Sequence, residues 1–543
     1  MAPKWFEDAV VYQIYPRSFG DTNGDGIGDL NGITERLDYL NDGTENSLGI
    51  DVIWINPFYP SPQYDFGYDV MDYRGVDPQY GTMEDFDRLL KEAHKRGIRI
   101  IMDMVPNHTS HLHPWFLESR SSKDNPKRDW YIWRPRPKRR KYPNNWLGIF
   151  GGRAWEWDNK TKEYYYHTCL PEQPDLNWRN PQVREAILSD MAFWLDKGVD
   201  GFRLDVINWT IKDKELRDNP HCIGRRPYDM QRHLYDKDRP EAVDVAKAMR
   251  RLADRYKDRV LVGEVELGPG GHSAGSVRAA PYLGKDGDGL HATFNFSFMY
   301  SRFSAEKFRA EVKAWEEAGG RRGWPTYVLS NHDEIRHVSR YANGEWTIPR
   351  AKVLAAMLLT LRGTPFLYYG EEIGMRNLRL KKSEILDPVG KRYWPFYPGR
   401  DGERTPMQWN ESVNAGFTTG EPWLRIHPDY RKSNVENQDK NPDSILNFYR
   451  RLIWIRKKNK ALRQGAYKEC LNSPKGVFSF SRETGEQSFF VALNFTAKKR
   501  HLTLEQVYAS KAKVILSEPE METKSLNTRD LDMAPYGVFI LEI

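Results

Sequence analysis

Cysteine is scarce in this chain of 543 residues, which contains only Cys169, Cys222 and Cys470. Three cysteines so widely spaced form neither a disulfide framework nor a metal-binding pattern, and they favour a reducing compartment. Long apolar runs are also missing. The first residues, MAPKWFEDAVVYQIYPRSF, lack the apolar stretch of a signal peptide, and no later segment approaches the length of a membrane span. We therefore expect a cytoplasmic protein with no membrane partner.

A large excess of one charge is absent as well. The 82 Lys and Arg residues nearly balance 75 Asp and Glu residues, which leaves a net charge of +7. Such a modest charge argues against a nucleic-acid partner. The one basic run, RPRPKRRK at residues 134–141, is interrupted by proline and predicts a solvated loop. We expect a small-molecule substrate and a monomer or homodimer.

Aromatic residues, in contrast, are abundant: they make up 13% of the chain and include 18 Trp and 29 Tyr. Sugar rings bind against flat aromatic faces, so this composition favours a carbohydrate ligand. Packing in a hydrophobic core explains any single ring equally well.

Short β-rich runs recur between amphipathic helical stretches. They lie at residues 10–15, 52–56, 98–105, 199–205, 260–265, 292–298, 326–329 and 365–369. Helical patterns fit between many of them, for example at 83–96 and 181–197. Strands that alternate with helices form a parallel sheet, and eight such units predict an α/β fold, the (β/α)8 TIM barrel.

The domain organisation follows from two departures from this alternation. The connection after the third run is too long for a simple loop and predicts an inserted subdomain at 104–175. The pattern then changes to short alternating strands, which predict a C-terminal antiparallel β domain at 468–543. The barrel would be built from residues 1–103 and 176–467.

Three carboxylates stand at the ends of three of the apolar runs: Asp205, Glu264 and Asp333. Cleavage of a glycosidic bond requires two carboxyl groups, one to attack or activate water and one to protonate the leaving oxygen. A third can stabilise the positive charge on the ring. In a TIM barrel the chemistry lies at these strand ends. Arg203 precedes Asp205 by two residues, so both should lie on the same side of a strand.

Blocks along the whole chain resemble those of one family, the α-amylase superfamily (glycoside hydrolase family 13), and within it the oligo-1,6-glucosidase and α-glucosidase branch. They are QIYPRSFGDTNGDGIGDLNGI, DFGYDVMDY, DMVPNHTS, QPDLNW, GFRLDVIN, SNHDE, GTPFLYYGEEIGM and ERTPMQW. Any one block would be a weak signal, but their number and order are specific. In this family QPDLN, at residues 173–177, distinguishes the branch from true α-amylases.

The resemblance implies roles for the three carboxylates. Asp205 resembles the nucleophile, Glu264 the general acid/base and Asp333 the transition-state stabiliser. A retaining enzyme holds the first two carboxyl groups roughly 5–5.5 Å apart, and we expect that spacing here. Glu264 must be protonated while Asp205 is ionised, and we expect the positive charge of Arg203 to keep Asp205 ionised.

The resemblance also implies a glucose-binding pocket. His108 and His332 resemble histidines that hydrogen-bond the bound glucose, and Tyr68 resembles its stacking platform. Asp65 and Arg404 resemble the pair that closes the pocket around the non-reducing end. Such a closed pocket argues against an endo-acting amylase.

An acidic loop near the start of the chain, DTNGDGIGD, is a candidate metal site. Alternate positions supply the oxygen ligands that hard cations prefer, with glycine between them, as in the first part of an EF-hand loop. The candidate ligands are Asp21, Asn23, Asp25, Ile27 and Asp29. The usual position-twelve glutamate is replaced by Gly32. The family resemblance implies a structural Ca²⁺ (or Mg²⁺); the alternative is a metal-free Asx-turn loop. No organic cofactor is expected.

Substrate preference stays open. Val206 follows the nucleophile, and in this branch valine there resembles α-1,6-active enzymes, although one methyl group discriminates by only ~1–3 kcal/mol. The segment VELGPGG at 265–271 departs from the oligo-1,6-glucosidase pattern on the leaving-group side. Maltose-type, trehalose, sucrose, nigerose and kojibiose linkages all remain candidates.

Three function classes compete. The first is an exo-acting α-glucosidase with transglucosylation as a side reaction. The second is an isomerase or transferase on the same scaffold, such as a trehalose synthase or sucrose isomerase; the RLDRD-type stretch of sucrose isomerases is replaced here by RHVSRY at 336–341. The third, a non-catalytic transporter subunit, is disfavoured because all three carboxylates are present and no membrane anchor is.

Overall fold

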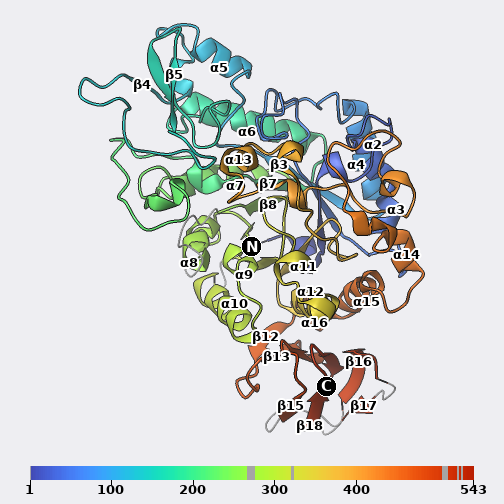
Figure 1. The fold of residues 1–543 in the computed structure, drawn as a ribbon. Coiled ribbons are helices and arrows are strands. Elements are labelled where there is room, and N and C mark those ends of the chain that lie inside the picture. Colours follow the sequence, from blue (N-terminus) through green and yellow to red (C-terminus); the bar gives the residue numbers. More distant parts are fainter. Residues whose placement is uncertain (1, 266–274, 320–322, 504–511, 522–524, 527–529) are drawn as a thin grey trace.

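An eight-stranded parallel sheet curves into a barrel at the centre of the molecule (Figure 1). The computed structural model describes residues 2–265, 275–319, 323–503, 512–521, 525–526 and 530–543. The barrel strands are β1 (Val11–Ile14), β2 (Val52–Ile55), β3 (Arg99–Met104), β7 (Gly201–Leu204), β8 (Val260–Gly263), β9 (Ala292–Thr293), β10 (Thr326–Val328) and β11 (Thr364–Tyr368). The predicted (β/α)8 barrel is confirmed.

The sheet order is β10-β11-β1-β2-β3-β7-β8-β9, and the barrel closes between its two end strands, β10 and β9. Phe294 forms a parallel bridge with Thr326. The Thr326 hydroxyl also donates a hydrogen bond of 2.8 Å to the carbonyl of Thr293. Every residue of β1, β2, β7 and β8 is buried, as expected for strands that helices cover on one face and barrel packing covers on the other.

Helices surround this barrel. The longer ones are α4 (Met83–Lys95), α6 (Pro181–Asp196), α7 (Ala242–Ala253), α10 (Ala305–Gly319), α12 (Thr347–Thr360) and α15 (Ile445–Lys458). The shorter ones are α1 (Lys4–Asp8), α2 (Leu30–Glu35), α3 (Leu37–Leu40), α8 (Gly275–Ala279), α9 (Phe296–Met299), α11 (His337–Arg340), α13 (Pro388–Tyr393), α14 (Val435–Asp439) and α16 (Lys460–Gln464). The helices predicted at 83–96 and 181–197 are confirmed to within one residue.

Helix α4 illustrates why the sequence forms these elements. Thr82 and Asp85 make a reciprocal capping box that satisfies backbone groups at its first turn. Its apolar residues recur every three or four positions and face the barrel: Phe86, Leu89, Leu90 and Ala93.

The sixth predicted strand was wrong beyond its first residues. The prediction spanned 292–298, but β9 ends at Thr293 and α9 begins at Phe296. Asn295 caps this helix, because its side chain accepts a hydrogen bond of 3.1 Å from the Phe298 amide. A short apolar run fits a strand or a buried helix equally, and the capping residue decides.

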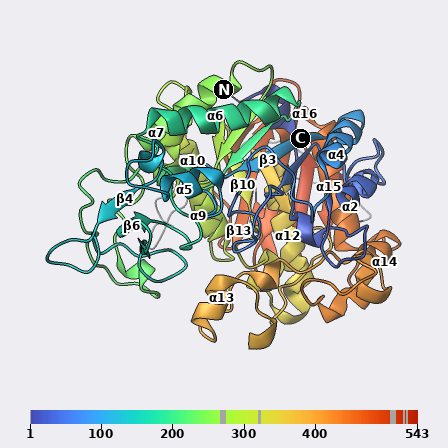
Figure 2. The same ribbon diagram turned by 90° about the horizontal axis from the view of Figure 1, so that it is seen from above.

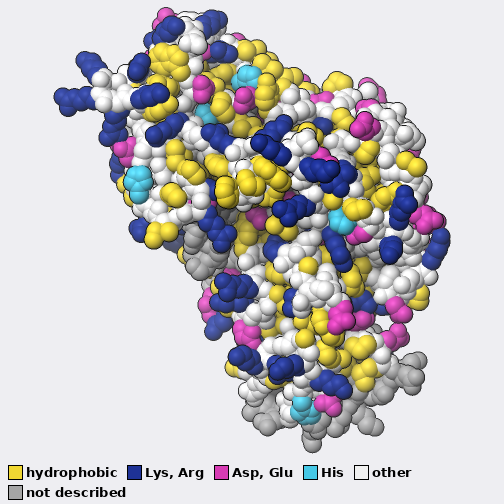
Figure 3. Space-filling model, in the orientation of Figure 1, with side chains coloured by type: hydrophobic (Ala, Val, Ile, Leu, Met, Phe, Trp, Pro, Cys, Tyr) yellow, Lys and Arg dark blue, Asp and Glu magenta, His cyan; other side chains and the backbone are white. Residues whose placement is uncertain are grey.

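The long connection after β3 folds as an insertion at one side of the barrel, which Figures 1 and 2 both show at the left. It contains α5 (Pro114–Ser119) and a sheet ordered β4-β6-β5. The three antiparallel strands are β4 (Trp133–Pro135), β5 (Trp155–Asp158) and β6 (Glu163–Tyr166). Aromatic side chains form its core: Trp146, Trp155, Tyr164 and Tyr166. The basic run at 134–141 is mostly exposed and projects as dark blue side chains in Figure 3.

The C-terminal region forms a second, antiparallel β unit (Figure 1). One six-stranded sheet runs in the order β12-β13-β14-β19-β16-β17, and β15 pairs with β18. Their bounds are β12 (Ala466–Glu469), β13 (Val477–Glu483), β14 (Ser488–Asn494), β15 (Arg500–Thr503), β16 (Ala512–Glu518), β17 (Ser525–Leu526), β18 (Asp530–Met533) and β19 (Val538–Glu542). Among the helices that the structure describes, none is long and apolar enough to cross a membrane.

Candidate active site

The three candidate catalytic carboxylates lie at one end of the barrel. Asp205 directly follows β7 and Glu264 directly follows β8, while Asp333 lies a few residues beyond β10. The backbone continues its pairing past the two strands, since the Glu264 amide donates to the Leu204 carbonyl at 2.9 Å. Strand register therefore fixes Asp205 and Glu264 side by side.

Arg203 lies between the carboxylates. One of its guanidinium nitrogens, Nη1, donates to Asp205 Oδ1 at 2.8 Å, and Nη2 donates to Glu264 Oε2 at 2.5 Å. Nη1 also forms an ion pair with Asp103, at the end of β3. Arg203 and Asp205 thus lie on the same side of the strand, as the strand period predicts. The buried Arg203 side chain therefore pairs with three carboxylates, those of Asp103, Asp205 and Glu264.

Burial dominates the ionisation of this cluster. It raises the pKa of Asp205 well above the ordinary value, and the Arg203 charge opposes it. Burial also raises the pKa of Glu264, again opposed by Arg203. Arg203 thus lowers the Asp205 pKa, as expected, but burial outweighs it. Its charge is divided among several partners, and neighbouring carboxylates add repulsion. Burial of the cluster therefore favours the protonated form of both carboxyl groups, against the charge of Arg203.

Val206 has an unusual backbone conformation next to the candidate nucleophile Asp205. Its φ of 34° and ψ of 47° lie in the left-handed region, which a β-branched side chain adopts only under strain. This conformation lets its amide donate to Glu264 Oε2 at 3.1 Å. The side chain packs with Cys169 and Trp209. Backbone strain here positions a hydrogen bond on the candidate acid/base.

Asp333 has a different environment. Its Oδ1 accepts hydrogen bonds from Arg400 at 3.0 Å and from Arg404 at 2.9 Å, and its Oδ2 lies 3.0 Å from His332 Nε2. Burial would raise its pKa, but the contact with His332 and the charges of Arg400 and Arg404 lower it below the ordinary range. The Asp333 side chain is 31% exposed, against 9% for Asp205. Asp333 is therefore a partly exposed carboxylate that its neighbours keep ionised.

Asp65 is also bound in this region, but its partner differs from the expected one. The predicted pairing with Arg404 was wrong. Asp65 Oδ1 instead accepts from Arg400 at 2.8 Å, and Arg404 donates to the His332 carbonyl at 2.7 Å. Arg400 also pairs with Asp387 at 2.8 Å and lies 4.7 Å from the centre of the Phe150 ring. Arg400 thus links Asp65 to Asp333.

Tyr68, the predicted stacking platform, directly contacts His332, one of the predicted glucose-binding histidines. The Tyr68 ring stacks on His332 with centroids 5.3 Å apart and an interplanar angle of 2°. Its hydroxyl lies 2.7 Å from His332 Nε2 and accepts from Asn56 at 2.8 Å. Gln13 bonds the other ring nitrogen of His332 at 2.9 Å. Burial lowers the pKa of His332 well below its ordinary value, so the ring is neutral.

His108 lies nearby, and Gln173 of the QPDLN block explains why. The Gln173 amide nitrogen lies 3.1 Å from His108 Nε2 and donates to Asp65 Oδ2 at 3.1 Å. His108 Nε2 also approaches the Tyr68 carbonyl at 3.2 Å. Two residues later, Asp175 pairs with Lys212 in a buried ion pair. The block joins the inserted subdomain to the pocket wall.

Sequence reasoning did not assign roles to several residues that complete this site. Asp103 contacts Arg203, and burial raises its pKa to about 6. Its position at the end of the third predicted strand was a usable signal. Arg400 stands four residues before Arg404, just outside the ERTPMQW block. Asp387 gave no signal, because it lies in a loop.

The acidic loop has the local geometry of an EF-hand-like turn. Asp21 accepts hydrogen bonds from the amides of Gly24 and Gly26, each at 2.8 Å, and Asn23 accepts from Asp25. Asp25 in turn accepts from the Ile27 amide at 2.8 Å. The donor set of carboxylate, amide and carbonyl oxygens suits a hard cation.

Asp29 has a further structural role at the end of this loop. Asp29 accepts from the Gly32 amide at 2.7 Å and so caps α2. Across the described ranges, no group of three or more His, Cys, Asp and Glu is placed to hold a metal ion. The segment 266–271, which we expected on the leaving-group side, lies outside the described residues.

Comparison with known proteins decides the family. The model described as "Alpha amylase, catalytic domain" matches residues 13–465. The chain belongs to the α-amylase family. It is a glycoside hydrolase that resembles glucosidases over its whole length. It is 44% identical to a Rhizobium meliloti protein named "Probable alpha-glucosidase", covering 91% of this chain and 89% of that one. An oligo-1,6-glucosidase of Parageobacillus thermoglucosidasius is 39% identical, with 99% of each chain covered.

Solved structures point to the same family. The α-glucosyl transfer enzyme XgtA is 39% identical with a TM-score of 0.90, and 100% of each chain is covered. An isomaltulose synthase mutant from Erwinia rhapontici, solved with sucrose, is 37% identical with a TM-score of 0.87, covering 100% of this chain and 99% of that one. Hydrolase, transferase and isomerase chemistry thus occur on this scaffold.

Proposed function

We propose that the protein is a retaining, exo-acting α-glucosidase that releases single glucose residues from the non-reducing ends of short α-linked oligosaccharides. The observation that carries this proposal is the link from Asp65 through Arg400 to Asp333. These charged groups, bridged to His108 by Gln173, form a wall beside the catalytic carboxylates. A wall there suits a pocket that admits one terminal sugar, whereas an endo-acting enzyme requires a through-going groove.

In the first step, Glu264 donates its proton to the glycosidic oxygen while the Asp205 carboxylate attacks the anomeric carbon. The bond to the leaving group breaks and a covalent β-glucosyl ester forms. Asp333 is suited to stabilise the positive charge that develops on the ring, because its neighbours keep it ionised. Arg203 orients both reacting carboxyls through its hydrogen bonds.

In the second step, Glu264 takes a proton from water, and the resulting hydroxide attacks the anomeric carbon and releases Asp205. Two inversions leave the product in the α configuration. A sugar hydroxyl that replaces the water would give transglucosylation. His108, His332 and Tyr68 are the side chains we assign to holding the glucose ring.

Product analysis over time tests this function, with isomaltose, maltose, sucrose and trehalose as separate substrates. We expect free glucose as the main product, released initially as the α-anomer. The fastest release from isomaltose would support the α-1,6 preference inferred from Val206. Rapid cleavage of maltose or sucrose with little action on isomaltose would keep the glucosidase proposal and discard that preference.

The second candidate is a disaccharide isomerase or transglucosylase. It is favoured by the similarity to structures named trehalulose synthase and isomaltulose synthase. Conversion of sucrose to an isomeric disaccharide with little free glucose would move the protein to this class. The three carboxylates would keep the same roles, because only the acceptor in the second step changes.

We also propose that the loop from Asp21 to Asp29 binds Ca²⁺ as a structural ion. Its neighbours support a structural role, since the Thr418 hydroxyl donates to Asp21 and the Trp423 amide donates to the Gly26 carbonyl. Chelation should lower the melting temperature, and added Ca²⁺ should restore it. Equal melting temperatures of chelated and Ca²⁺-loaded protein would leave the metal-free Asx-turn loop.

A cytoplasmic location is proposed on the cysteine pattern. Cys169, Cys222 and Cys470 are all free thiols. Cell fractionation with an antibody to the protein would test it, and recovery from an extracellular fraction would contradict it.

A further inference from the structure

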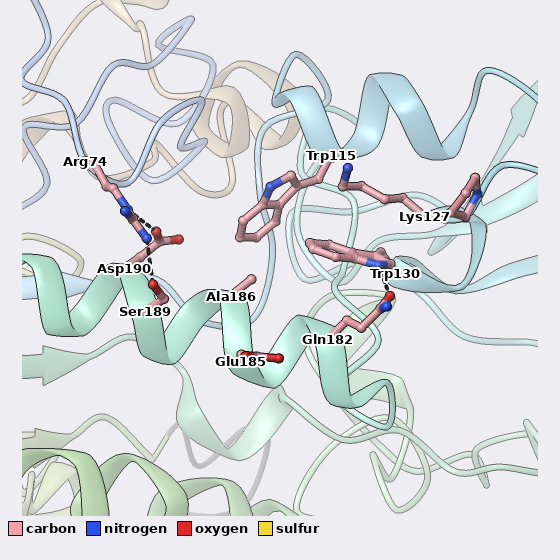
Figure 4. Close-up of a pocket in the computed structure, with 10 residues that line it drawn as sticks. Arg74, Trp115, Lys127, Trp130, Gln182, Glu185, Ala186, Ser189 and Asp190 are labelled. Atoms are coloured by element: carbon pink, nitrogen blue, oxygen red, sulfur yellow. Dashed lines mark hydrogen bonds and ion pairs between the residues drawn. The ribbon is translucent and has the colours of Figure 1, made fainter.

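A second pocket lies where the inserted subdomain meets helix α6, and none of the assigned catalytic residues lines it (Figure 4). Its volume is about 480 Å³, which is enough for a sugar ring or two. Residues from α5, the segment around 126–130, the loop at Arg74 and the outer face of α6 contribute to its lining. The pocket therefore joins the insertion to the barrel.

Two tryptophans form one wall. The rings of Trp115 and Trp130 meet edge to face, with centroids 4.9 Å apart and planes at 68°. The Trp130 indole donates to Gln182 Oε1 at 3.1 Å, which holds the ring against α6. Trp115 is only half-buried and faces the pocket beside Ala186 in Figure 4. Fixed aromatic faces of this kind suit the apolar face of a sugar ring.

A polar ledge lies opposite the tryptophans. Arg74 donates to Asp190 Oδ1 at 2.7 Å and to the Ser189 hydroxyl at 2.8 Å. The Arg74 side chain remains 47% exposed, while Asp190 is 8% exposed. A carboxylate and a guanidinium held side by side offer both acceptors and donors, which matches vicinal hydroxyl groups.

The charges around the pocket favour a neutral ligand. Arg74 is paired with Asp190, and Lys127 is paired with Glu118 at 2.6 Å. Both cations that line the pocket are thus already neutralised, so an anionic ligand gains little. Among the described residues, Glu185 forms no ion pair in the pocket, and one carboxylate does not make a cation site.

We propose that this pocket is a second carbohydrate-binding site that takes a neutral α-linked oligosaccharide. It holds a sugar ring against Trp115, which the buried Trp130 supports, and its hydroxyls on the Arg74–Asp190 ledge. The identity of the sugar rests on the proposed function, but the binding does not require turnover. Such a site would raise the local concentration of oligosaccharide near the active site.

Filling the pocket tests the proposal. Ala186 lines it from α6, and Ala186→Arg would fill the space without removing an aromatic ring. Ala192 on the same helix is also half-buried against the core but does not line the pocket, so Ala192→Arg is the matched control. Ser189→Arg provides a second filling variant from an exposed position.

Binding of maltotetraose and isomaltotriose would be measured by calorimetry in a Glu264→Gln background, which slows consumption of the ligand. We expect two sites per chain for at least one of these probes, and at least about tenfold weaker binding at one site in both filling variants. Hydrolysis of an aryl α-glucoside by the single variants Ala186→Arg and Ala192→Arg should equal that of the unmodified protein.

A single binding site in the Glu264→Gln protein would overturn the proposal. Two sites that survive both filling variants, with unchanged melting temperatures, would overturn it as well. If Ala186→Arg alone lowers the melting temperature, Ser189→Arg decides. These outcomes are independent of the proposed function, because either a hydrolase or an isomerase could have or lack a second sugar-binding site at this pocket.

Discussion

Replacing Arg203 tests the electrostatic design of the active site most directly. Arg203→Lys keeps the positive charge but offers one nitrogen, which cannot occupy the positions of both Nη1 and Nη2. At least one charge-assisted hydrogen bond, to Asp205 or to Glu264, is then lost, at a cost of about 1.5–3 kcal/mol. If that bond acts in the transition state, kcat/KM should fall ~10- to 150-fold.

Arg203→Met removes the charge as well and separates its effect from geometry. Arg203 lowers the pKa values of both Asp205 and Glu264, so its removal raises both. The proposed mechanism requires Asp205 ionised and Glu264 protonated. The acid limb of the kcat/KM profile and its alkaline limb should therefore both move to higher pH. Arg203→Lys should move them much less.

The assay is the pH profile of aryl α-glucoside hydrolysis, measured with the melting temperature of each variant. Arg99→Lys is the control, because Arg99 pairs with Asp200 at 2.9 Å at the opposite end of the barrel. A folded Arg203→Met protein whose limbs stay in place, or move to lower pH, would refute the reasoning. Breaking a buried charge cluster costs about 3–5 kcal/mol, so a lower melting temperature is expected for this variant.

Four further predictions address individual roles. Glu264→Gln should lower kcat by ~10²–10⁴ for natural disaccharides and less for aryl glucosides with good leaving groups, as parallel assays would show; Asp205→Ala should abolish both, and wild-type-like turnover would contradict its role. Asp65→Ala should weaken glucose binding, seen as a raised inhibition constant for glucose. Val206→Thr should shift the isomaltose-to-maltose ratio of kcat/KM by less than ~200-fold; an unchanged ratio would discard its specificity role. Burial raises the pKa of Glu372 to about 7, so the folded protein loses stability as pH rises from about 4.5 to 7. Glu372→Gln should remove about 3 kcal/mol of that pH-dependent loss. Urea titrations at pH 5 and pH 8 would measure the difference.

The positions of Asp205 and Glu264 could be predicted because apolar runs end where barrel strands end. Arg203 followed from the strand period. The partner of Asp65 could not be predicted, because Arg400 reaches it across 335 positions of the chain. Two arginines four residues apart are equivalent in sequence, and only tertiary packing distinguishes them.

Two local elements lack a periodic pattern in the sequence. Strand β15 (Arg500–Thr503) places only Leu502 in the core, so it lacks the alternation that identifies a strand. All four residues at 296–299 are buried, including Ser297, so the segment gives no amphipathic period. The net rise of the Asp205 pKa also escaped prediction, because burial of the cluster outweighs the nearest charge.

The contacts of Arg400 have a consequence for the order in which activity appears. This one side chain ties together Asp65, Asp333 and Asp387, which different parts of the chain contribute. A ribosome-bound chain that ends before residue 400 can already hold Arg203, Asp205 and Glu264, yet it lacks the cation that fixes the third carboxylate. Glucoside hydrolysis would therefore begin only after the last segment of the barrel has docked. The nascent protein would therefore be inactive until the part of the site that selects the sugar has formed.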